Sequence, residues 1–237
     1  MRTIAVLPVK SFAAAKQRLS VLLGGGSRKA LAQAMLTDVL AGLRRVPALE
    51  AIAVVTGDRV AESSALRSGA RVLRDFQEAG QSEAALIGIR HAVDAGFERV
   101  LLVPGDTPLL EPSELFSLLR RSRERQVGAA IVPDRHGTGT NALLLAPPDV
   151  VEPSFGPGSL ERHVAAAGAA GVAYTVDPLP SLALDVDTPD DLVELSSVLE
   201  QRRGKAPMTQ GALCQLDRSQ VRRSVQARAA ARTAVRA

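Results

Sequence analysis

RVLLVPGDTPLL, residues 99–110, contains the feature that decides the fold class. It begins with a short apolar run, 99–103, that lacks polar alternation and is followed at once by Pro104, Gly105 and Asp106. An unbroken apolar run of this length predicts a strand buried on both faces, as in a helix-covered parallel sheet. Ligands bind such sheets beyond the carboxyl ends of the strands, so Asp106 lies where a binding site is expected.

On both sides of this run, short apolar segments typical of strands alternate with longer segments whose apolar residues have helical spacing. The expected strands are 3–9, 51–56, 71–74, 99–103, 128–132, 141–145, 172–176 and 182–186. The expected helices are 28–45 with Ser27 as N-cap, 60–68, 82–95 with Ser82 as N-cap, 112–125, one after Pro157 and one that begins at Thr188. Strands that alternate with helices predict one α/β domain over residues 1–200, with a mostly parallel central sheet covered by helices.

The positive charge is concentrated at the end of the chain. The net charge is +4, but residues 201–237 hold nine Lys or Arg and one acidic residue, a local charge of +8. The first 200 residues therefore carry −4, which disfavours a polyanion-binding role for the folded domain. We expect residues 201–237 to form a basic, flexible tail.

The composition excludes several classes of protein. Aromatic residues make up 3% of the chain and Trp is absent, so stacking platforms for single-stranded nucleic acid are not expected. The one cysteine, Cys214, excludes an internal disulfide and a cysteine-based zinc site. The apolar N-terminus stops at Lys10, too short for a secretory or membrane-spanning segment. We expect a cytoplasmic protein that binds no membrane.

Lys10, Lys16 and Arg18 are three cations in the loop after the first strand. At the carboxyl end of a buried strand they can neutralise a nucleoside triphosphate, although a solvated basic loop has the same composition. The glycines of 24–26 lack the lysine and hydroxyl residue that end a phosphate-binding P-loop, and they indicate a turn.

Asp106, Asp185 and Asp187 are the candidate metal ligands. Asp185 and Asp187 are two residues apart in a predicted extended segment, so their side chains point to the same face. Three carboxylates form a hard oxygen site that suits Mg²⁺. The alternative is that each is a turn or capping aspartate, and Asp187 directly precedes the helix start at Thr188 and Pro189.

Two further loops have the composition of anion-binding sites. PDRHGTGTN, 133–141, offers backbone N–H groups and hydroxyls, and FGPGS, 155–159, leads directly into a helix N-terminus. Together with a metal cluster, they indicate two phosphate-bearing substrates. His136 either donates to a phosphate or is structural, whereas His91 and His163 are interpreted as ordinary helix histidines.

These segments, in this order, resemble the guanylyltransferases of coenzyme F420 biosynthesis, which act on phosphoenolpyruvate or 2-phospho-L-lactate. The resemblance covers about residues 1–200 and leaves the basic tail unmatched. It rests on VLPVKSFAAAKQRLS (6–20), PGDTPLL (104–110), PDRHGTGTNALLL (133–145), FGPGSLERH (155–163) and LALDVDTPDDL (182–192).

The resemblance implies a single-domain fold like that of GT-A nucleotidyltransferases, with GTP as substrate and Mg²⁺ as cofactor. Carried over by motif, the metal ligands would be Asp106, Asp185 and Asp187, and phosphoenolpyruvate would be bound by Thr140, Gly156 and Ser159. The residues that would contact GTP are Lys10, Lys16, Arg18 and Gly105. The catalytic residues would be Asp106, Lys10 and Lys16. One departure leaves base recognition open, because Gln81-Ser82-Glu83 stands where the family often has a Leu-Asn pair.

The implied reaction is in-line attack of a phosphate oxygen of phosphoenolpyruvate on the α-phosphorus of GTP, which releases pyrophosphate. A phosphate monoester has a second pKa of about 6, so it is largely dianionic at pH 7 and needs no protein base. The product would pass to the next enzyme of the pathway. The acceptor (phosphoenolpyruvate, 2-phospho-L-lactate or 3-phosphoglycerate) and the oligomeric state stay open.

Two alternative functions remain on sequence alone. One is another nucleotidyltransferase of the same fold, of the molybdenum-cofactor or sugar-phosphate type. Those enzymes typically have a glycine-rich loop after the first strand, which VLPVKSFAAAK is not. The other is a non-catalytic nucleotide- or RNA-binding protein that works through its arginine-rich tail.

Overall fold

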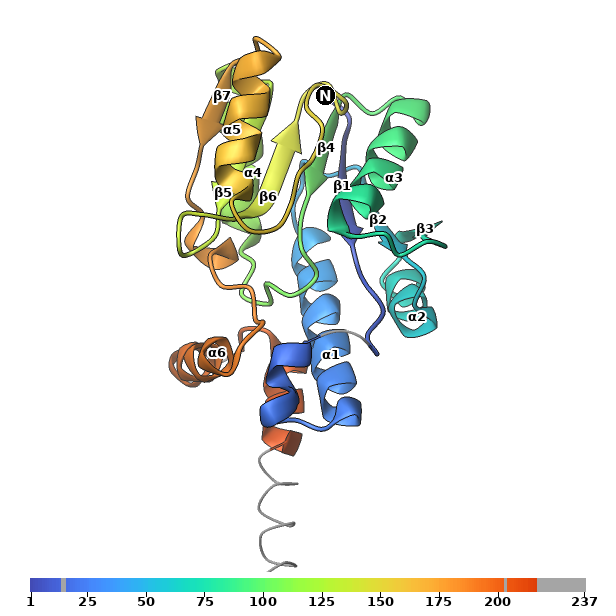
Figure 1. Cartoon of the computed structure of the whole chain (residues 1–237), viewed down its shortest axis with the longest axis vertical. Coiled ribbons are helices and arrows are strands. Elements are labelled where there is room, and N and C mark those ends of the chain that lie inside the picture. Colours follow the sequence, from blue (N-terminus) through green and yellow to red (C-terminus); the bar gives the residue numbers. More distant parts are fainter. Residues whose placement is uncertain (14–15, 203, 217–237) are drawn as a thin grey trace, which may run out of the picture.

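The computed structural model describes residues 1–13, 16–202 and 204–216. One mixed seven-stranded sheet forms its centre, in the order β3-β2-β1-β4-β6-β5-β7 (Figure 1). β6 runs antiparallel to β4 and β5, and the other pairings are parallel. The strands are β1 (Thr3–Pro8), β2 (Ala51–Thr56), β3 (Arg71–Arg74), β4 (Arg99–Leu102), β5 (Ala129–Pro133), β6 (Thr140–Leu145) and β7 (Tyr174–Val176).

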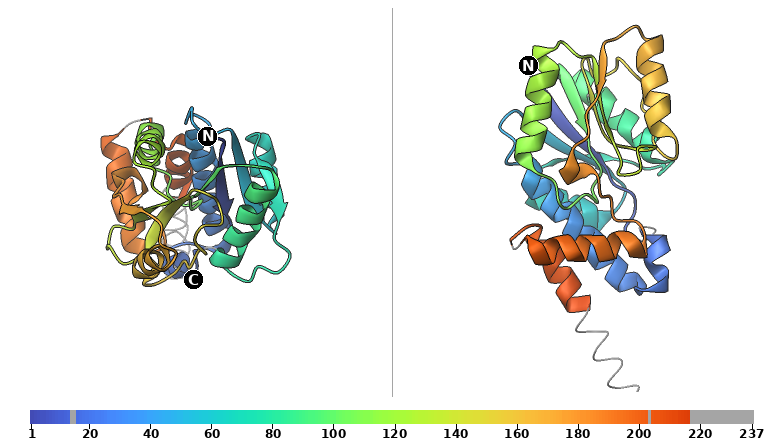
Figure 2. Two further views of the ribbon diagram at one scale, coloured as in Figure 1. Left: turned by 90° about the horizontal axis from the view of Figure 1, so that it is seen from above. Right: turned by 90° about the vertical axis from the view of Figure 1, so that its left-hand side faces the viewer.

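Helices cover both faces of this sheet (Figure 2). The α-helices are α1 (Gly25–Leu43), α2 (Arg59–Arg67), α3 (Gln81–Asp94), α4 (Pro112–Glu124), α5 (Ser159–Ala169) and α6 (Pro189–Gln201). α1, α2 and α4 pack on the face that carries Ala5 and Leu7 of β1, and α3 and α5 pack on the face that carries Ile4 and Val6. The predicted α/β class with a mostly parallel, helix-covered sheet is confirmed.

Close contact between α3 and β1 depends on Gly88. A Cβ atom at this position would lie 2.2 Å from Cγ1 of Val6, so no larger residue fits without movement of the helix. This contact brings the first turn of α3 close to the carboxyl end of β1, which matters for the site described below.

Two predicted helix caps are wrong. α1 begins at Gly25 after Gly24, and α3 begins at Gln81 after Gly80, so Ser27 and Ser82 both lie inside their helices. The Ser82 hydroxyl instead accepts a hydrogen bond from the Phe155 backbone N–H at 2.9 Å. Ser82 thereby holds the loop before α5 rather than the end of its own helix.

The strand predicted over 182–186 is also wrong. A 3-10 helix, η2 (Pro180–Leu182), occupies its start, and the rest is a loop whose backbone bonds to other loops. Val186 N–H, for example, donates to the Asp106 carbonyl at 3.2 Å. The alternating apolar residues belong to different hydrophobic clusters. Leu182 packs in the cluster on the sheet face that carries Ala5 and Leu7, whereas Leu184 and Val186 pack in the cluster that contains α6.

Packed structure continues past the predicted boundary at residue 200. A helix over 207–216 lies beside α1, and the Asp38 carboxylate accepts hydrogen bonds from the Thr209 backbone at 2.7 Å and hydroxyl at 2.6 Å. The remainder of the predicted flexible tail, 217–237, lies outside the described residues. Within the part that is described, no helix has the length and apolar character that crossing a bilayer requires.

Candidate active site

A pocket of about 620 Å³ lies at the carboxyl ends of β1, β3, β4 and β5. The parallel strands β1, β3 and β4 end on the same side of the sheet, which brings together loops that are far apart in the chain. Every predicted site residue lines this pocket: Lys10, Lys16, Arg18, Gly105, Asp106, Thr140, Gly156, Ser159, Asp185 and Asp187. The roles assigned to these residues stay predictions, but the expectation that they share one site agrees with their placement.

One wall of the pocket carries the three aspartates and a lysine. The Lys16 ammonium donates to Asp106 and, at 2.7 Å, to Asp187 Oδ1. Burial alone would lower the pKa of Lys16, whose side chain is 6% exposed, but the two carboxylates raise it above its usual value. Lys16 therefore lies as a fixed positive charge between two of the three predicted metal ligands.

Asp185 completes this wall. Its pKa is raised, first by burial and then by the negative charges of Asp106 and Asp187. Asn141 Nδ2 donates to Asp185 Oδ1 at 3.4 Å and holds the loop through the Leu182 carbonyl at 2.6 Å.

The donor set fits a hard divalent cation in its chemistry, because all three side chains offer carboxylate oxygens. Within residues 1–13, 16–202 and 204–216, however, no three acidic, histidine or cysteine side chains are arranged as a metal site. The Lys16 ammonium lies between Asp106 and Asp187 and forms an ion pair with each of them. An ion held by both of these carboxylates would require Lys16 to move away.

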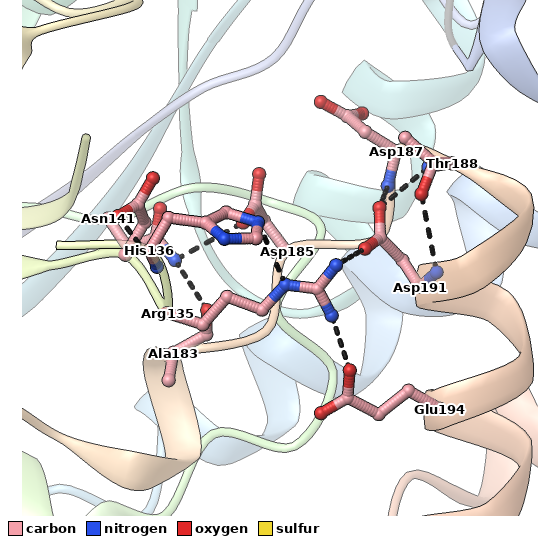
Figure 3. A network of polar contacts seen from close by, with 10 residues as sticks. Arg135, His136, Asn141, Ala183, Asp185, Asp187, Thr188, Asp191 and Glu194 are labelled. Atoms are coloured by element: carbon pink, nitrogen blue, oxygen red, sulfur yellow. Dashed lines mark hydrogen bonds and ion pairs between the residues drawn. The ribbon is translucent and has the colours of Figure 1, made fainter. Parts of the chain in front are cut away.

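The loop that bears Asp187 is held by Arg135 (Figure 3). Arg135 forms ion pairs with Asp191 and Glu194 of α6. Asp191 in turn accepts hydrogen bonds from the backbone N–H groups of Asp187, at 2.9 Å, and Thr188, at 2.6 Å. Burial would raise the pKa of Asp191, but these hydrogen bonds and Arg135 lower it.

This arrangement excludes the capping interpretation of the Asp187 side chain, and its role as a metal ligand stays a prediction. The cap of α6 is the capping box formed by Thr188 and Asp191, not the Asp187 side chain. Asp187 is half exposed and lines the pocket, where its carboxylate contacts Lys16. The helix start was predictable from the sequence, whereas the hydrogen bond by which Asp191 holds the backbone of Asp187 was not.

Replacing Arg135 by leucine should destabilise the protein by about 1–3 kcal/mol, because Asp191 is buried and would lose its charged partner. Urea unfolding measures this effect. Arg120→Leu is the matched control, since it removes an exposed pair with Glu124 at 3.7 Å that contributes about 0.5 kcal/mol or less. Equal losses in the two variants would contradict a special role for Arg135.

Another part of the pocket lining comes from the two loops that are predicted to bind anions. Thr140, the first residue of β6, and Ser159, the first residue of α5, are both buried and line the pocket. Gly156 has a φ of 104°, a backbone conformation open to glycine. Arg162 reaches back over the same loop and donates to the carbonyls of Ser154, Phe155 and Pro157.

His163 is a core residue, one of the two positions predicted for a helix histidine, but it also contacts the predicted site residue Thr140, which was not predicted from the sequence. Its ring is fully buried, with Nδ1 2.9 Å from Thr140 Oγ1 and Nε2 2.9 Å from the Ser154 backbone nitrogen. Burial, with a smaller contribution from Arg162, lowers the pKa of His163 to about 4. The available signal was its spacing, because residues four apart on a helix share a face, and Ser159 precedes it by four.

The rest of the pocket lining supplies further charged side chains of both signs. Among the described residues, neither Lys10 nor Arg18 forms an ion pair, so both are available to an anionic ligand. Asp75, Glu78 and Gln81, in the loop between β3 and α3 and at the start of α3, line the side that sequence analysis left open.

Comparisons with known proteins agree with this geometry. The phosphoenolpyruvate guanylyltransferase of Conexibacter woesei is 49% identical over 219 residues, which cover 92% of this chain and 98% of that protein. The protein of the same name from Sphaerobacter thermophilus is 38% identical over 83% of this chain and 93% of its own length.

Solved structures support the fold. A putative nucleotide-diphospho-sugar transferase from Desulfovibrio desulfuricans G20 superposes with a TM-score of 0.71 at 21% identity, covering 92% of this chain and 96% of that chain. A cytidylyltransferase from Leptospira borgpetersenii superposes with a TM-score of 0.60 at 12% identity, covering 93% of this chain and 96% of that chain. The expected nucleotidyltransferase fold is therefore confirmed. The model of the family described as "Guanylyl transferase CofC like" matches residues 3–206, and the chain belongs to this family of nucleotidyltransferases.

Proposed function

We propose that this protein transfers GMP from GTP to phosphoenolpyruvate, giving enolpyruvoyl-2-diphospho-5'-guanosine and pyrophosphate, in coenzyme F420 biosynthesis. The observation that carries the proposal is one pocket with two chemically distinct walls, one of cations and carboxylates and one of hydroxyls at a helix N-terminus. A volume of about 620 Å³ lies within the range of small-molecule sites. The names of the curated relatives supply the substrates.

The chain's own residues act by positioning and by charge. Lys10, Lys16 and Arg18 would neutralise the triphosphate and the departing pyrophosphate, while Thr140 and Ser159 would orient the acceptor. Because the acceptor phosphate is already a dianion near pH 7, its oxygen can attack the α-phosphorus without a protein base.

Mg²⁺ is part of the proposal, with Asp106, Asp185 and Asp187 as its ligands. When bound it would neutralise charge that develops around the α-phosphate. Lys16, once displaced from between Asp106 and Asp187, would be free to contact the phosphates. Burial and then the negative charges of Asp106 and Asp187 raise the pKa of Asp185, and a cation bound at this wall would offset both effects.

Guanine recognition is proposed for the wall formed by Asp75 and Glu78. Guanine presents two neighbouring N–H donors on its Watson–Crick edge, and a carboxylate accepts both, whereas adenine presents one donor beside an acceptor. Glu78 has a φ of 46°, which is costly for a residue other than glycine and is typical of functional sites. Its exposed side chain lines the pocket.

Replacing Glu78 by glutamine should lower kcat/KM for GTP about tenfold, equivalent to ~1.4 kcal/mol, and narrow the preference for GTP over ATP. Steady-state kinetics with both nucleotides measure this change. Glu200→Gln is the matched control, since Glu200 is an exposed glutamate of α6 outside the pocket lining. An unchanged GTP-to-ATP ratio in the Glu78 variant would remove Glu78 from base recognition.

The function itself is tested by pyrophosphate release in a matrix of GTP, CTP and ATP against phosphoenolpyruvate, 2-phospho-L-lactate and 3-phosphoglycerate. We expect the highest rate with GTP and phosphoenolpyruvate. Pyrophosphate release with a different pair would keep the protein among the nucleotidyltransferases but would change the substrates assigned to it. Absence of release with every pair would contradict the proposed transfer.

We place the reaction in the cytoplasm, with transfer of the product to the next enzyme of the pathway. The exposed free thiol of Cys214 is compatible with a reducing compartment.

A further inference from the structure

His163 connects the two segments that form the hydroxyl wall of the pocket. It lies on α5, and its ring nitrogens contact Thr140 of β6 and the backbone of Ser154 in the loop before α5. The Phe155 ring packs edge-on against it, with centroids 5.3 Å apart. A fully buried histidine with both nitrogens engaged has a fixed orientation and a fixed hydrogen-bonding pattern.

The contact with Ser154 assigns the tautomer. A backbone N–H can only donate, so Nε2 of His163 must accept and carries no hydrogen. In the neutral ring the hydrogen is then on Nδ1. Nδ1–H donates to Thr140 Oγ1 at 2.9 Å, and the hydroxyl oxygen is the acceptor in this contact.

This direction leaves the Thr140 hydroxyl hydrogen free for the pocket. Because the hydroxyl already accepts from His163, its own hydrogen cannot point at the ring, and among the described residues Thr140 Oγ1 has no other hydrogen-bond partner. With the opposite tautomer the hydroxyl would donate to His163 and would present only lone pairs to the pocket. Lone pairs would repel an anion, whereas a hydroxyl hydrogen attracts one.

Ser159 provides an independent sign of a ligand at the same wall. Its Oγ is buried and has no hydrogen-bond partner in the structure, although buried hydroxyls are normally paired. The residue is 1% exposed, lines the pocket and begins α5. The backbone N–H groups of Ser159 and Leu160 already donate to the carbonyls of Gly156 and Thr138, so the Ser159 hydroxyl is a group of this turn that still lacks a partner among the described residues. Two buried hydroxyls thus line the same pocket, and hydroxyl donors suit an anionic group.

We propose that His163 is a positioning residue for the second substrate: its Nδ1–H fixes the Thr140 hydroxyl as a donor to the phosphate or carboxylate of a phosphorylated carboxylic acid. The proposal rests on the proposed function in one respect, that this wall binds the acceptor rather than the nucleotide. His163 itself does not contact the acceptor. It acts through Thr140 and through the loop at Ser154.

The tautomer can be tested on the wild-type protein without any variant of His163. ¹⁵N spectra of the protein labelled at its three histidines distinguish a ring protonated on Nδ1 from one protonated on Nε2. His91→Gln and His136→Gln assign the signals by elimination. We expect His163 to carry its hydrogen on Nδ1 at neutral pH. A ring protonated on Nε2 would overturn the proposal, whatever reaction the protein catalyses.

Kinetics then test the role. In His163→Asn the amide nitrogen replaces Nδ1 and keeps a donor to Thr140, whereas in His163→Gln the amide lies near Nε2 and that donor is lost. We expect His163→Gln to raise the KM for the acceptor about tenfold, with the KM for GTP within about twofold of wild type. His163→Asn should keep the acceptor KM within about threefold of wild type. A parallel rise of both KM values in both variants indicates a purely structural role and overturns the proposal.

A double substitution identifies the route of the effect. If His163 acts through the Thr140 hydroxyl, His163→Gln should raise the acceptor KM no further in a Thr140→Val background. Additive effects would contradict the proposal. His91→Gln, which changes a histidine of α3 outside the pocket lining, is the kinetic control and should leave all constants unchanged. If the wild-type protein releases no pyrophosphate from any substrate pair, the proposed function fails, while the spectroscopic result still stands.

Discussion

Asp106→Asn is expected to lower kcat by about 10²–10³-fold while the protein stays folded. Asp106 follows β4 at the centre of the carboxylate wall, and its side chain contacts Lys16. Two contacts survive the substitution: the Asp106 carbonyl still accepts from Val186 N–H at 3.2 Å, and Lys16 keeps its ion pair with Asp187. The neutral amide keeps the shape but removes the negative charge that we assign to cation binding.

Pyrophosphate release at saturating GTP and phosphoenolpyruvate measures this loss, with circular dichroism and urea unfolding as checks of the fold. Asp94→Asn is the matched control, since Asp94 is an exposed residue of α3 away from the pocket and should leave kcat unchanged. A rate near wild type in the Asp106 variant would remove Asp106 from the site and, with it, the central metal ligand.

The sequence predicted the central strands well because β1 and β4 are buried along nearly their whole length. β2 and β3 match their predicted bounds, and β1 and β4 differ by one residue at an end. The prediction over 182–186 failed because alternating apolar residues also arise when a chain passes between two hydrophobic clusters. The spacing of apolar residues alone does not distinguish a paired strand from such a loop, since a strand forms only where the edge of a neighbouring strand is free to pair with it.

The serine caps failed for a related reason. Ser82 is a good N-cap by residue type, yet α3 begins one residue earlier and its hydroxyl is used by Phe155 from another part of the chain. Helix ends are set by competition between local capping and distant partners, and the sequence shows only the local side. The cap at Thr188 was predicted correctly because Pro189 and Asp191 reinforce it locally.

The composition of the site was predictable, and its internal contacts were not. Runs that end in Lys, Asp or Gly after buried strands identified the residues that meet in the pocket. The contact of Lys16 with Asp106 spans 90 positions, and that of Arg135 with Asp191 spans 56. Such pairs depend on loop conformation, as at Lys16, whose φ is 56°. No periodicity in the sequence encodes that angle.

Lys16→Met should separate the two roles that the structure suggests for this side chain. We expect kcat to fall by about 10²-fold, because a charge that meets the phosphates is lost. We also expect the protein without nucleotide to bind Mn²⁺, a probe for Mg²⁺, about tenfold more tightly, since the ammonium no longer competes for Asp106 and Asp187. The side chain is 6% exposed, so methionine fills a similar volume in buried surroundings.

Calorimetric titration with Mn²⁺ measures the affinity of the protein for the ion independently of turnover. Lys29→Met, which removes an exposed positive charge of α1 outside the pocket lining, controls for the change in net charge. Asp106→Asn should weaken Mn²⁺ binding, so the two neighbouring substitutions are expected to shift the same equilibrium in opposite directions. If Lys16→Met leaves Mn²⁺ affinity unchanged or lowers it, then Lys16 does not compete with a divalent ion. The carboxylate wall would in that case serve to orient the lysine toward the triphosphate.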